Sequence, residues 1–135
     1  MGSSALKGSE WIWKDGDFVP WGEAKVHLLA VAVQFGASMF EGIRCYQTDR
    51  GPAVFRLKEH IRRLHDSCKI YRMPLTHSHA TLVDACRETV RRNGLTDCYI
   101  RPMVLWGYGS AGMHPADSPL ETWVAAWPWG AYLGE

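Results

Sequence analysis

Three side chains in this sequence have the chemistry to bind anions. The guanidinium of Arg63 can donate two parallel hydrogen bonds to a phosphate or a carboxylate. Tyr99 and Arg101 are two positions apart in an apolar segment, so in a strand both side chains lie on one face. A phenol and a guanidinium among apolar neighbours are costly to bury unless they serve a ligand or a partner.

Each of these residues also has a simpler interpretation. Arg63 fits a solvated helix arginine, which is the interpretation we give to its neighbour Arg62. Tyr99 and Arg101 fit an edge-strand pair that faces water, and Pro102 favours an edge or a bulge. The residues alone leave both interpretations open.

Aromatic residues and one glycine are further candidates for a binding pocket. Trp129 and Tyr132 follow Pro128 near the C-terminus, and Phe40 stands two positions before Gly42. A single Trp near the end of a strand is usually a core residue. At Gly42 the missing side chain lets the backbone approach a ligand closely.

Four segments carry a resemblance to a known family. The segments are Phe40-Glu41-Gly42-Ile43-Arg44-Cys45-Tyr46, Arg63-Leu64-His65-Asp66-Ser67, Tyr99-Ile100-Arg101-Pro102 and Trp129-Gly130-Ala131-Tyr132. In these segments the chain resembles the first domain of branched-chain amino acid aminotransferases, which are pyridoxal-phosphate enzymes of fold type IV. The similarity covers nearly the whole chain, from about Trp11 to Glu135.

The resemblance implies a role for each candidate residue. Arg63 would bind the cofactor phosphate, Tyr99 would help to hold the substrate α-carboxylate, and Arg101 would meet the side-chain carboxylate of glutamate. The remaining residues would line the substrate pocket: Phe40, Gly42, Trp129 and Tyr132.

Two further substrate-site positions depart from the family pattern. Phe35 stands where bacterial members usually have a tyrosine that reaches the neighbouring subunit's pocket. Met113 stands in a loop where a smaller aliphatic residue is common. The missing hydroxyl at Phe35 puts one glutamate contact in doubt, and both departures bear on substrate preference.

The implied reaction transfers the amino group of leucine, isoleucine or valine to 2-oxoglutarate, with pyridoxal phosphate as the electron sink. In the family the Schiff-base lysine lies beyond residue 135. Lysines stand here at positions 7, 14, 25, 58 and 69, and none is at the family's catalytic position. We therefore assign no catalytic residue to the chain. We expect it to be inactive alone and not to hold the cofactor.

We expect residues 1–10 to be a disordered tail or a cloning scar. Residues 11–135 would be the N-terminal small domain of a two-domain aminotransferase, without the domain that carries the cofactor lysine. The expected partners are a small-molecule amino acid and 2-oxo acid, that second domain, and further copies in a homodimer or higher homo-oligomer.

The elements that position these residues follow from hydrophobic patterning. Hairpins are expected at 10–14 with 17–21, and at 40–48 with 52–57. Asp15-Gly16 favours a type I′ turn in the first hairpin, because both central residues of that turn need a positive φ. The turn of the second hairpin would be 49–51.

Two helices and two strands complete the prediction. A helix is expected over 56–72, because apolar residues recur at helical spacing, and a second runs from a cap at Ser78 or Thr81 to about Asn93. Strands over 98–106 and 121–127 flank an exposed, flexible loop rich in Gly and Pro. This order predicts an α+β fold, a mostly antiparallel sheet with two packed helices. The resemblance implies the N-terminal domain of the D-amino acid aminotransferase-like fold.

The composition excludes several classes of protein. The formal net charge of +1 gives no reason to expect nucleic acid as a partner. The longest apolar run, residues 28–33, is far too short to span a membrane. The four cysteines form no C-x-x-C pair, so we expect reduced, buried thiols in a cytoplasmic protein, and no metal site.

Three alternatives remain open on the sequence. The first is another fold type IV enzyme, such as a D-amino acid aminotransferase, an amine transaminase or an aminodeoxychorismate lyase. The second is a non-catalytic, aromatic-rich binding domain, since seven Trp would suit stacking on sugar rings. Trp11, Trp13, Trp123, Trp127 and Trp129 nevertheless alternate within strands as core residues do. The third is a structural or interaction domain that has lost catalysis.

Overall fold

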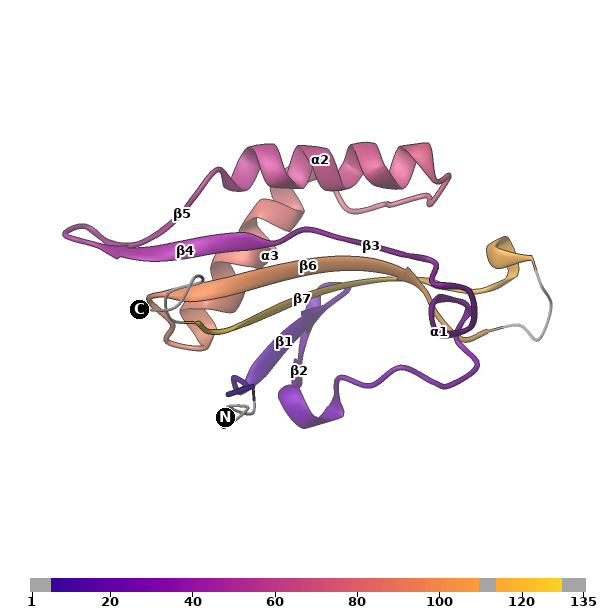
Figure 1. Ribbon diagram of the computed structural model, residues 1–135, viewed down its shortest axis with the longest axis horizontal. Helices are drawn as coiled ribbons and strands as arrows, with labels where there is room; N and C mark the ends of the chain where they lie inside the picture. The colour runs from indigo at the N-terminus through magenta and orange to yellow at the C-terminus, as the bar shows by residue number, and fades with distance from the viewer. Residues whose placement is uncertain (1–5, 110–113, 130–135) are drawn as a thin grey trace, which may run out of the picture.

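The computed structural model describes residues 6–109 and 114–129. In these residues seven strands form one antiparallel sheet, and two long helices pack across one of its faces (Figure 1). The strands are β1 (Trp11–Lys14), β2 (Asp17–Pro20), β3 (Ser38–Phe40), β4 (Ile43–Thr48), β5 (Gly51–Val54), β6 (Cys98–Trp106) and β7 (Leu120–Pro128). The helices are α1 (Val31–Phe35), α2 (Leu57–Ile70) and α3 (His79–Arg92), with 3-10 turns at η1 (Trp21–Glu23) and η2 (Pro115–Asp117).

The sheet is built around its two longest strands, β6 and β7. Its order is β2-β1-β7-β6-β4-β5, and β3 also pairs with β6. Phe40 of β3 is opposite Met103, and Ile43 of β4 is opposite Ile100. Because β3 and β4 both pair with β6, the short segment between them is held against the middle of that strand.

Amphipathic patterning explains the two long helices. The buried residues of α2 recur four, three and four positions apart, at Leu57, Ile61, Leu64 and Cys68. Helix α3 starts after Ser78, whose hydroxyl accepts a hydrogen bond from the Thr81 amide at 3.1 Å. This cap satisfies one of the free amides at the helix start. Of the two caps that the sequence allowed, the structure therefore has Ser78.

Strand β6 separates the two faces of the sheet. Its residues Cys98, Ile100 and Val104 are fully buried in the main core, on the side of α2 and α3. Tyr99, Arg101 and Met103 alternate with them and lie on the other side, which we call the open face. At one end of the open face a smaller cluster forms around Ile12, Leu105 and Trp123.

Most of the predicted elements are confirmed, including the α+β class and the antiparallel sheet. Strand β6 has the predicted limits, Cys98–Trp106. Asp15 and Gly16 have φ values of 47° and 110°, as the predicted hairpin turn requires. Trp13, Trp106 and Trp123 are buried members of the two core clusters, so these three indoles pack as core residues.

Some elements were not predicted. Helix α1 and strand β3 are additional, and the loop between β6 and β7 contains a 3-10 turn at Pro115–Asp117. The end of the expected tail is attached to the domain: the Glu10 amide donates to Asn93 Oδ1 at 3.0 Å, and the Ser9 hydroxyl donates to the Ala126 carbonyl. The folded region therefore includes Ser9 and Glu10.

All four cysteines are free and buried, as predicted. Burial raises the pKa of the Cys68 thiol to about 11, which keeps it protonated near neutral pH. Among the described residues, no helix has both the length and the apolar character needed to cross a membrane. In the same residues, no group of three or more His, Cys, Asp or Glu is placed to hold a metal ion.

Candidate functional site

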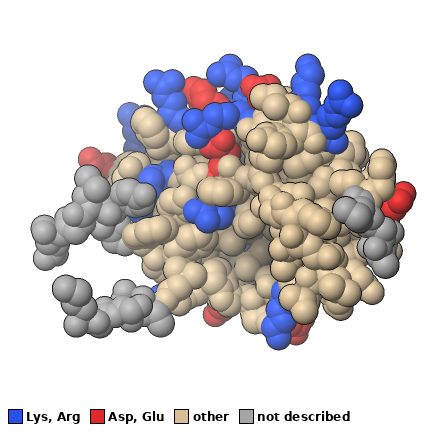
Figure 2. Space-filling view, turned by 45° about the vertical axis from the view of Figure 1, so that its right-hand side comes forward, with Lys and Arg blue, Asp and Glu red and all other residues tan. Residues whose placement is uncertain are grey.

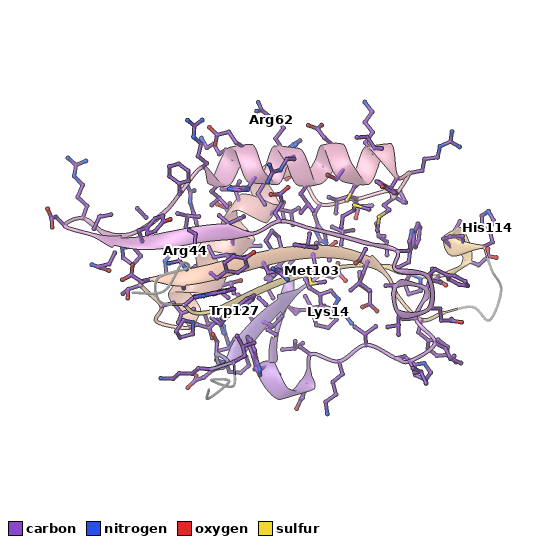
Figure 3. The ribbon with its side chains drawn as sticks, viewed as in Figure 1. Lys14, Arg44, Arg62, Met103, His114 and Trp127 are labelled. Atoms are coloured by element: carbon purple, nitrogen blue, oxygen red, sulfur yellow. The ribbon has the colours of Figure 1, made fainter. Side chains whose placement is uncertain are left out.

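The open face of the sheet carries Tyr99 and Arg101 together. Trp127 of β7 is opposite Tyr99 on one side, and Arg44 of β4 is opposite Tyr99 on the other side. Figure 3 shows Arg44, Met103 and Trp127 along this stretch of the sheet. Three adjacent strands thus place a phenol, an indole and two guanidinium groups side by side.

Arg101 lies among aromatic rings. Its guanidinium carbon is 4.3 Å from the centre of the Phe40 ring, 5.2 Å from that of Tyr99 and 5.8 Å from that of Trp127. Its terminal nitrogen donates to the Tyr99 hydroxyl at 2.9 Å. These contacts fix the side chain by stacking and by one hydrogen bond to a neutral hydroxyl, and no carboxylate of the described residues forms an ion pair with it.

Two buried donors on this face lack an acceptor. Arg101 Nε and Trp127 Nε1 are both buried, and neither has a hydrogen-bond partner among the described residues. A buried donor without an acceptor costs free energy, and for a charged group the cost is larger. The arrangement therefore suits a ligand that brings an anionic acceptor, such as a carboxylate.

Gly42 is needed for the position of the Tyr99 ring. A Cβ atom at Gly42 would lie 2.0 Å from the Tyr99 hydroxyl oxygen. Contacts that short do not occur, so any side chain at position 42 would displace the phenol. The sequence predicted close approach of a ligand at Gly42, and the structure shows Tyr99 in close approach there.

Trp129 extends the aromatic wall. The ring centres of Tyr99 and Trp129 are 4.7 Å apart, those of Tyr99 and Trp127 are 5.0 Å apart, and those of Trp127 and Trp129 are 5.9 Å apart. Offset and tilted rings at these distances attract one another beyond their buried area. The three rings therefore form a firm apolar surface beside the guanidinium of Arg101.

Arg63 binds a carboxylate of its own chain. Its Nε and one terminal nitrogen donate to the two carboxylate oxygens of Glu41 at 2.7 and 2.6 Å, and His60 Nδ1 lies 2.8 Å from Glu41 Oε2. The Glu41 side chain is only 5% exposed, whereas that of Arg63 is 68% exposed. Arg63 thus keeps donors toward solvent while Glu41 fixes the plane of its guanidinium.

Electrostatics keep Glu41 ionised. Burial alone would raise its pKa, but the hydrogen bonds from Arg63 and His60 and the charge of Arg63 hold the pKa of Glu41 below its usual value. The hydrogen bond to Glu41 and the charge of Glu41 in turn raise the pKa of Arg63. A negative charge is therefore kept beneath the most exposed guanidinium of this site.

The segment from Phe40 to Gly42 joins the two halves of the site. Phe40 contacts Arg101, Glu41 binds Arg63, and Gly42 accommodates Tyr99. The Glu41 amide donates to the Pro102 carbonyl at 3.1 Å, which ties the segment to β6. The structure thus brings Phe40, Gly42, Tyr99, Arg101 and Trp129 into direct contact, and it links Arg63 to them through Glu41.

Among the described residues, Phe35 makes none of these contacts. Phe35 is the last residue of α1, and its side chain is 57% exposed. Met113 and Tyr132 lie outside the described residues.

Sequence analysis missed Glu41 and Trp127 as site residues, although each left a signal. Trp127 precedes Trp129 by two positions, and the period of a strand places both on one side. Glu41 is a charged residue directly between Phe40 and Gly42, both of which were candidates. The contact between Glu41 and Arg63 could not be predicted, because it depends on how the β3–β4 segment and α2 pack in the fold.

Comparisons with known proteins identify the family of the chain. Residues 38–135 match the family described as amino-transferase class IV. The chain belongs to the class IV aminotransferases. It is 49% identical over 129 residues to a branched-chain-amino-acid aminotransferase of Escherichia coli, an alignment that covers 95% of this chain and 42% of that protein.

Solved structures of this class have the same fold. A branched-chain amino acid aminotransferase from Escherichia coli superimposes with a TM-score of 0.88 at 49% identity, covering 93% of this chain and 42% of that one. A T.th. enzyme solved with pyridoxamine 5′-phosphate gives a TM-score of 0.89 at 48% identity, with 97% and 43% covered. The chain therefore spans less than half the length of these relatives.

Proposed function

We propose that this class IV aminotransferase chain forms the N-terminal part of a branched-chain amino acid aminotransferase. The whole enzyme would transfer the amino group of leucine, isoleucine or valine to 2-oxoglutarate. One observation carries the proposal: Arg101 is fixed by aromatic rings on the open face while its buried Nε has no partner among the described residues. A carboxylate-bearing substrate supplies the acceptor that this arrangement needs.

The residues present fit the phosphate of pyridoxal phosphate at Arg63. Glu41 occupies one edge of the guanidinium, and the exposed side chain leaves donors for an external anion. When bound, the cofactor supplies an electron sink for the substrate's α-carbon. The role of this chain would be to hold the phosphate and to orient it through the fixed plane of Arg63.

The substrate would meet two kinds of surface on the open face. Tyr99 would help to hold the α-carboxylate, and Arg101 would bind the second carboxylate of glutamate or 2-oxoglutarate. The apolar surface of Phe40, Trp127 and Trp129 would accept the aliphatic side chain of leucine, isoleucine or valine. One pocket could then take both substrates, because the guanidinium of Arg101 lies against Phe40 and beside Trp127.

The resemblance also assigns roles to Phe35, Met113 and Tyr132. Phe35 would extend toward a neighbouring subunit, in keeping with its exposed ring, and Met113 and Tyr132 would complete the pocket. We propose a homodimer or higher homo-oligomer, a second domain that carries the cofactor lysine, and a cytoplasmic location. The free, buried thiols suit the reducing conditions of that compartment.

The test of this proposal is the substitution Arg101→Gln in the whole enzyme. We expect kcat/KM for 2-oxoglutarate to fall about 10- to 100-fold, because charge-assisted hydrogen bonds to the second carboxylate are lost. The kcat/KM for leucine should change much less, since its side chain has no carboxylate.

Arg50→Gln is the matched control. Arg50 is an exposed arginine in the turn between β4 and β5, so its loss removes the same charge away from the site. An equal loss for both substrates in Arg101→Gln would refute the role of Arg101. Failure of the unaltered enzyme to transaminate leucine with 2-oxoglutarate would refute the proposed function itself.

The 135-residue chain should not catalyse the reaction alone. Of its lysines, Lys14 stands over the Trp123 ring at 4.7 Å, and Lys58 and Lys69 are exposed on α2. Incubation of this chain with pyridoxal phosphate, leucine and 2-oxoglutarate should give no glutamate, and measurable turnover would contradict this expectation.

A further inference from the structure

A depression on the helix side of the molecule is lined by positive charge. It lies between the C-terminal half of α2 and the first turn of α3 and has a volume of about 560 Å³. The charged and imidazole side chains that line it are Arg62, His65, Asp66, Lys69, Arg72 and His79. Figure 2 shows Lys and Arg gathered over α2, the helix at the top of the molecule.

The cations of this depression are not neutralised by the protein. Among the described residues, Arg62, Lys69 and Arg72 form no ion pair. By contrast, Arg56 and Arg63 of the same region each pair with a glutamate. The three cations of the depression are therefore available to an external anion.

The backbone places Arg72 at an unusual position for an arginine. Arg72 has a φ of 53° just after the end of α2. Its amide donates to the Lys69 carbonyl at 3.1 Å, and the Met73 amide donates to the Cys68 carbonyl at 2.8 Å. Glycine usually occupies this position of the helix-ending motif, because it tolerates a positive φ. The positive φ of Arg72 is unfavourable for a residue with a side chain, and it places the guanidinium in the lining of the depression.

Two stacked histidines line the depression, and one ring nitrogen of His65 lacks a partner. The rings of His65 and His79 are stacked with their centres 3.9 Å apart, and His65 Nε2 is buried without a hydrogen-bond partner in the described part of the chain. Burial, together with the neighbouring His79, lowers the pKa of His65, although Asp66 opposes this effect. The charge of a bound anion would favour the imidazolium form of His65.

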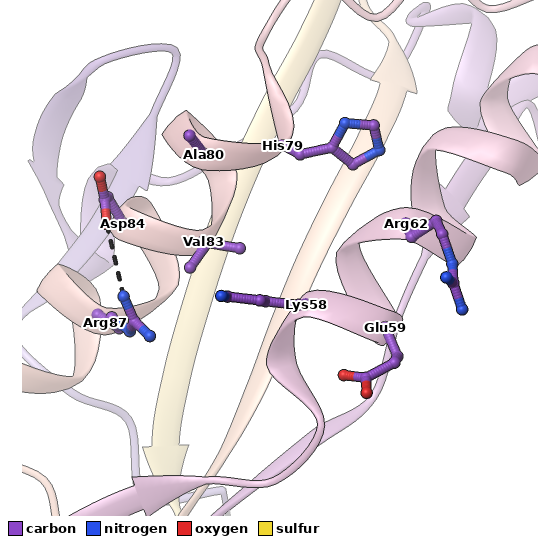
Figure 4. Close-up of a pocket in the computed structure, with 8 residues that line it drawn as sticks. All are labelled: Lys58, Glu59, Arg62, His79, Ala80, Val83, Asp84 and Arg87. Atoms are coloured by element: carbon purple, nitrogen blue, oxygen red, sulfur yellow. Dashed lines mark ion pairs between the residues drawn. The ribbon is translucent and has the colours of Figure 1, made fainter.

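The start of α3 contributes a fourth feature. His79 is its first residue and points toward α2, as Figure 4 shows in the neighbouring pocket, which shares Arg62 and His79 with this depression. The Ser78 hydroxyl caps only the Thr81 amide, and the first amides of a helix favour negative charge. Unpaired guanidinium groups, an unpartnered imidazole nitrogen and a helix N-terminus thus meet in one depression.

We propose that this depression binds a small dianion of the phosphate class. Arginine forks and helix amides suit the tetrahedral oxygens of such a group. The depression is local and the formal net charge of the chain is only +1, which suits a small ligand and not a nucleic acid. Asp66 remains as the acidic side chain in the lining, and it would limit the site to anions that Arg62, Lys69 and Arg72 can outweigh.

The test follows the His65 ring by NMR. Inorganic sulfate is the probe, because it keeps its double charge over the range in which histidine titrates. The pKa of His65 is measured in sodium chloride and in sodium sulfate at equal ionic strength. We expect sulfate to raise the pKa of His65 by about one unit. Inorganic phosphate should reproduce the effect, and an unchanged His65 titration in both anions would overturn the proposal.

Matched variants separate a site from general screening. Lys69→Gln and Arg72→Gln should each reduce the sulfate effect by half or more, whereas Arg50→Gln, in the distant β4–β5 turn, should retain it in full. A reduction in Arg50→Gln as large as that in Arg72→Gln would refute a local site. The His27 ring, which stacks on Tyr108, is the internal reference for folding and should keep its chemical shifts in every variant. The readout needs no turnover, so its failure would leave the proposed function untouched.

Discussion

At the scale of single residues, the site depends on the space that Gly42 leaves for Tyr99. The phenol is held on three sides, by the Gly42 backbone, by the Arg101 guanidinium and by the Trp127 and Trp129 rings. Its hydroxyl oxygen therefore has one available position. A change at position 42 acts on the orientation of Tyr99 before it acts on the fold.

We predict that Gly42→Ala displaces Tyr99. The added Cβ would lie 2.0 Å from the hydroxyl oxygen, so the ring must move. We expect a loss of stability of about 1–3 kcal/mol, as for other overpacked sites, and a fall in kcat/KM of about 100-fold in the whole enzyme. Chemical denaturation and steady-state kinetics measure the two effects.

Gly22→Ala is the control for this substitution, because a Cβ at Gly22 meets nothing within 4 Å. It should leave both stability and activity nearly unchanged. Equal effects of the two substitutions would show that the Tyr99 contact is not what makes position 42 sensitive.

The Glu41 carboxylate makes stability depend on pH. Its pKa is lowered in the folded protein, so its contribution is present above the unfolded value, near 4.5, and is lost as the pH falls through the folded value. We predict that Glu41→Gln destabilises the protein by about 1–3 kcal/mol at neutral pH. The difference from the unaltered protein should shrink as the pH falls below about 4.5.

Urea denaturation across this pH range measures the effect, and Glu59→Gln is its control. Glu59 pairs with Arg56 on the exposed side of α2, and surface pairs contribute little. If the loss in free energy of unfolding caused by Glu41→Gln did not shrink below about pH 4.5, this would contradict the ionised state of Glu41.

At the scale of elements, the caps and ends of the two long helices determine where they meet. Ser78 fixes the start of α3, and that start lies against α2 through the stacked rings of His65 and His79. The end of α2 is fixed by the backbone bonds around Arg72. The register between the helices therefore depends on their termini as well as on their buried faces.

We predict that Ser78→Ala lowers the free energy of unfolding by about 1 kcal/mol, because the Thr81 amide loses its acceptor. Thermal or urea denaturation measures the change. Thr76→Ala, in the exposed segment before the cap, should cost much less, and a similar cost at both positions would argue against the cap.

The elements also show what the sequence could and could not predict. Strand β6 and helices α2 and α3 were predicted nearly in full, because nine to fourteen residues carry a clear period. Helix α1 has five residues and β3 has three, too few for a period to appear. These two are held by tertiary contacts instead, as β3 is by β6.

The candidate site divides in the same way. Tyr99 and Arg101 share a strand, so their common face followed from the period of that strand. The bidentate contact between Arg63 and Glu41 joins α2 to the β3–β4 segment, and it depends on how those elements pack. Sequence patterns describe faces within an element, whereas partners between elements need the topology.

At the scale of the whole molecule, the exposed apolar surface is unevenly distributed. Five large apolar residues are exposed between positions 26 and 35: Val26, Leu28, Leu29, Val33 and Phe35. Four of these five residues are aliphatic and none is a Trp, so this surface is mainly aliphatic. Exposed apolar surface of this kind promotes association.

We predict that the 135-residue chain self-associates in a concentration-dependent way, because this aliphatic surface is removed from water on contact. Sedimentation velocity over a range of concentrations measures it. The double substitution Leu28→Ser and Phe35→Ser should shift the equilibrium toward the monomer, while Ile70→Ser, an exposed apolar residue on α2, should not. A chain that stays monomeric at all concentrations would contradict the prediction.

The position of β7 in the sheet has a consequence for biosynthesis. This strand comes last of the described strands in the sequence, yet it lies between β1 and β6 and joins the first hairpin to the remainder of the sheet. While the ribosome is still making residues before Leu120, the β1–β2 hairpin has no neighbour to pair with. The nascent polypeptide must therefore wait for β7, and a nascent chain released before that point would expose two separate sheet edges to chaperones and to aggregation.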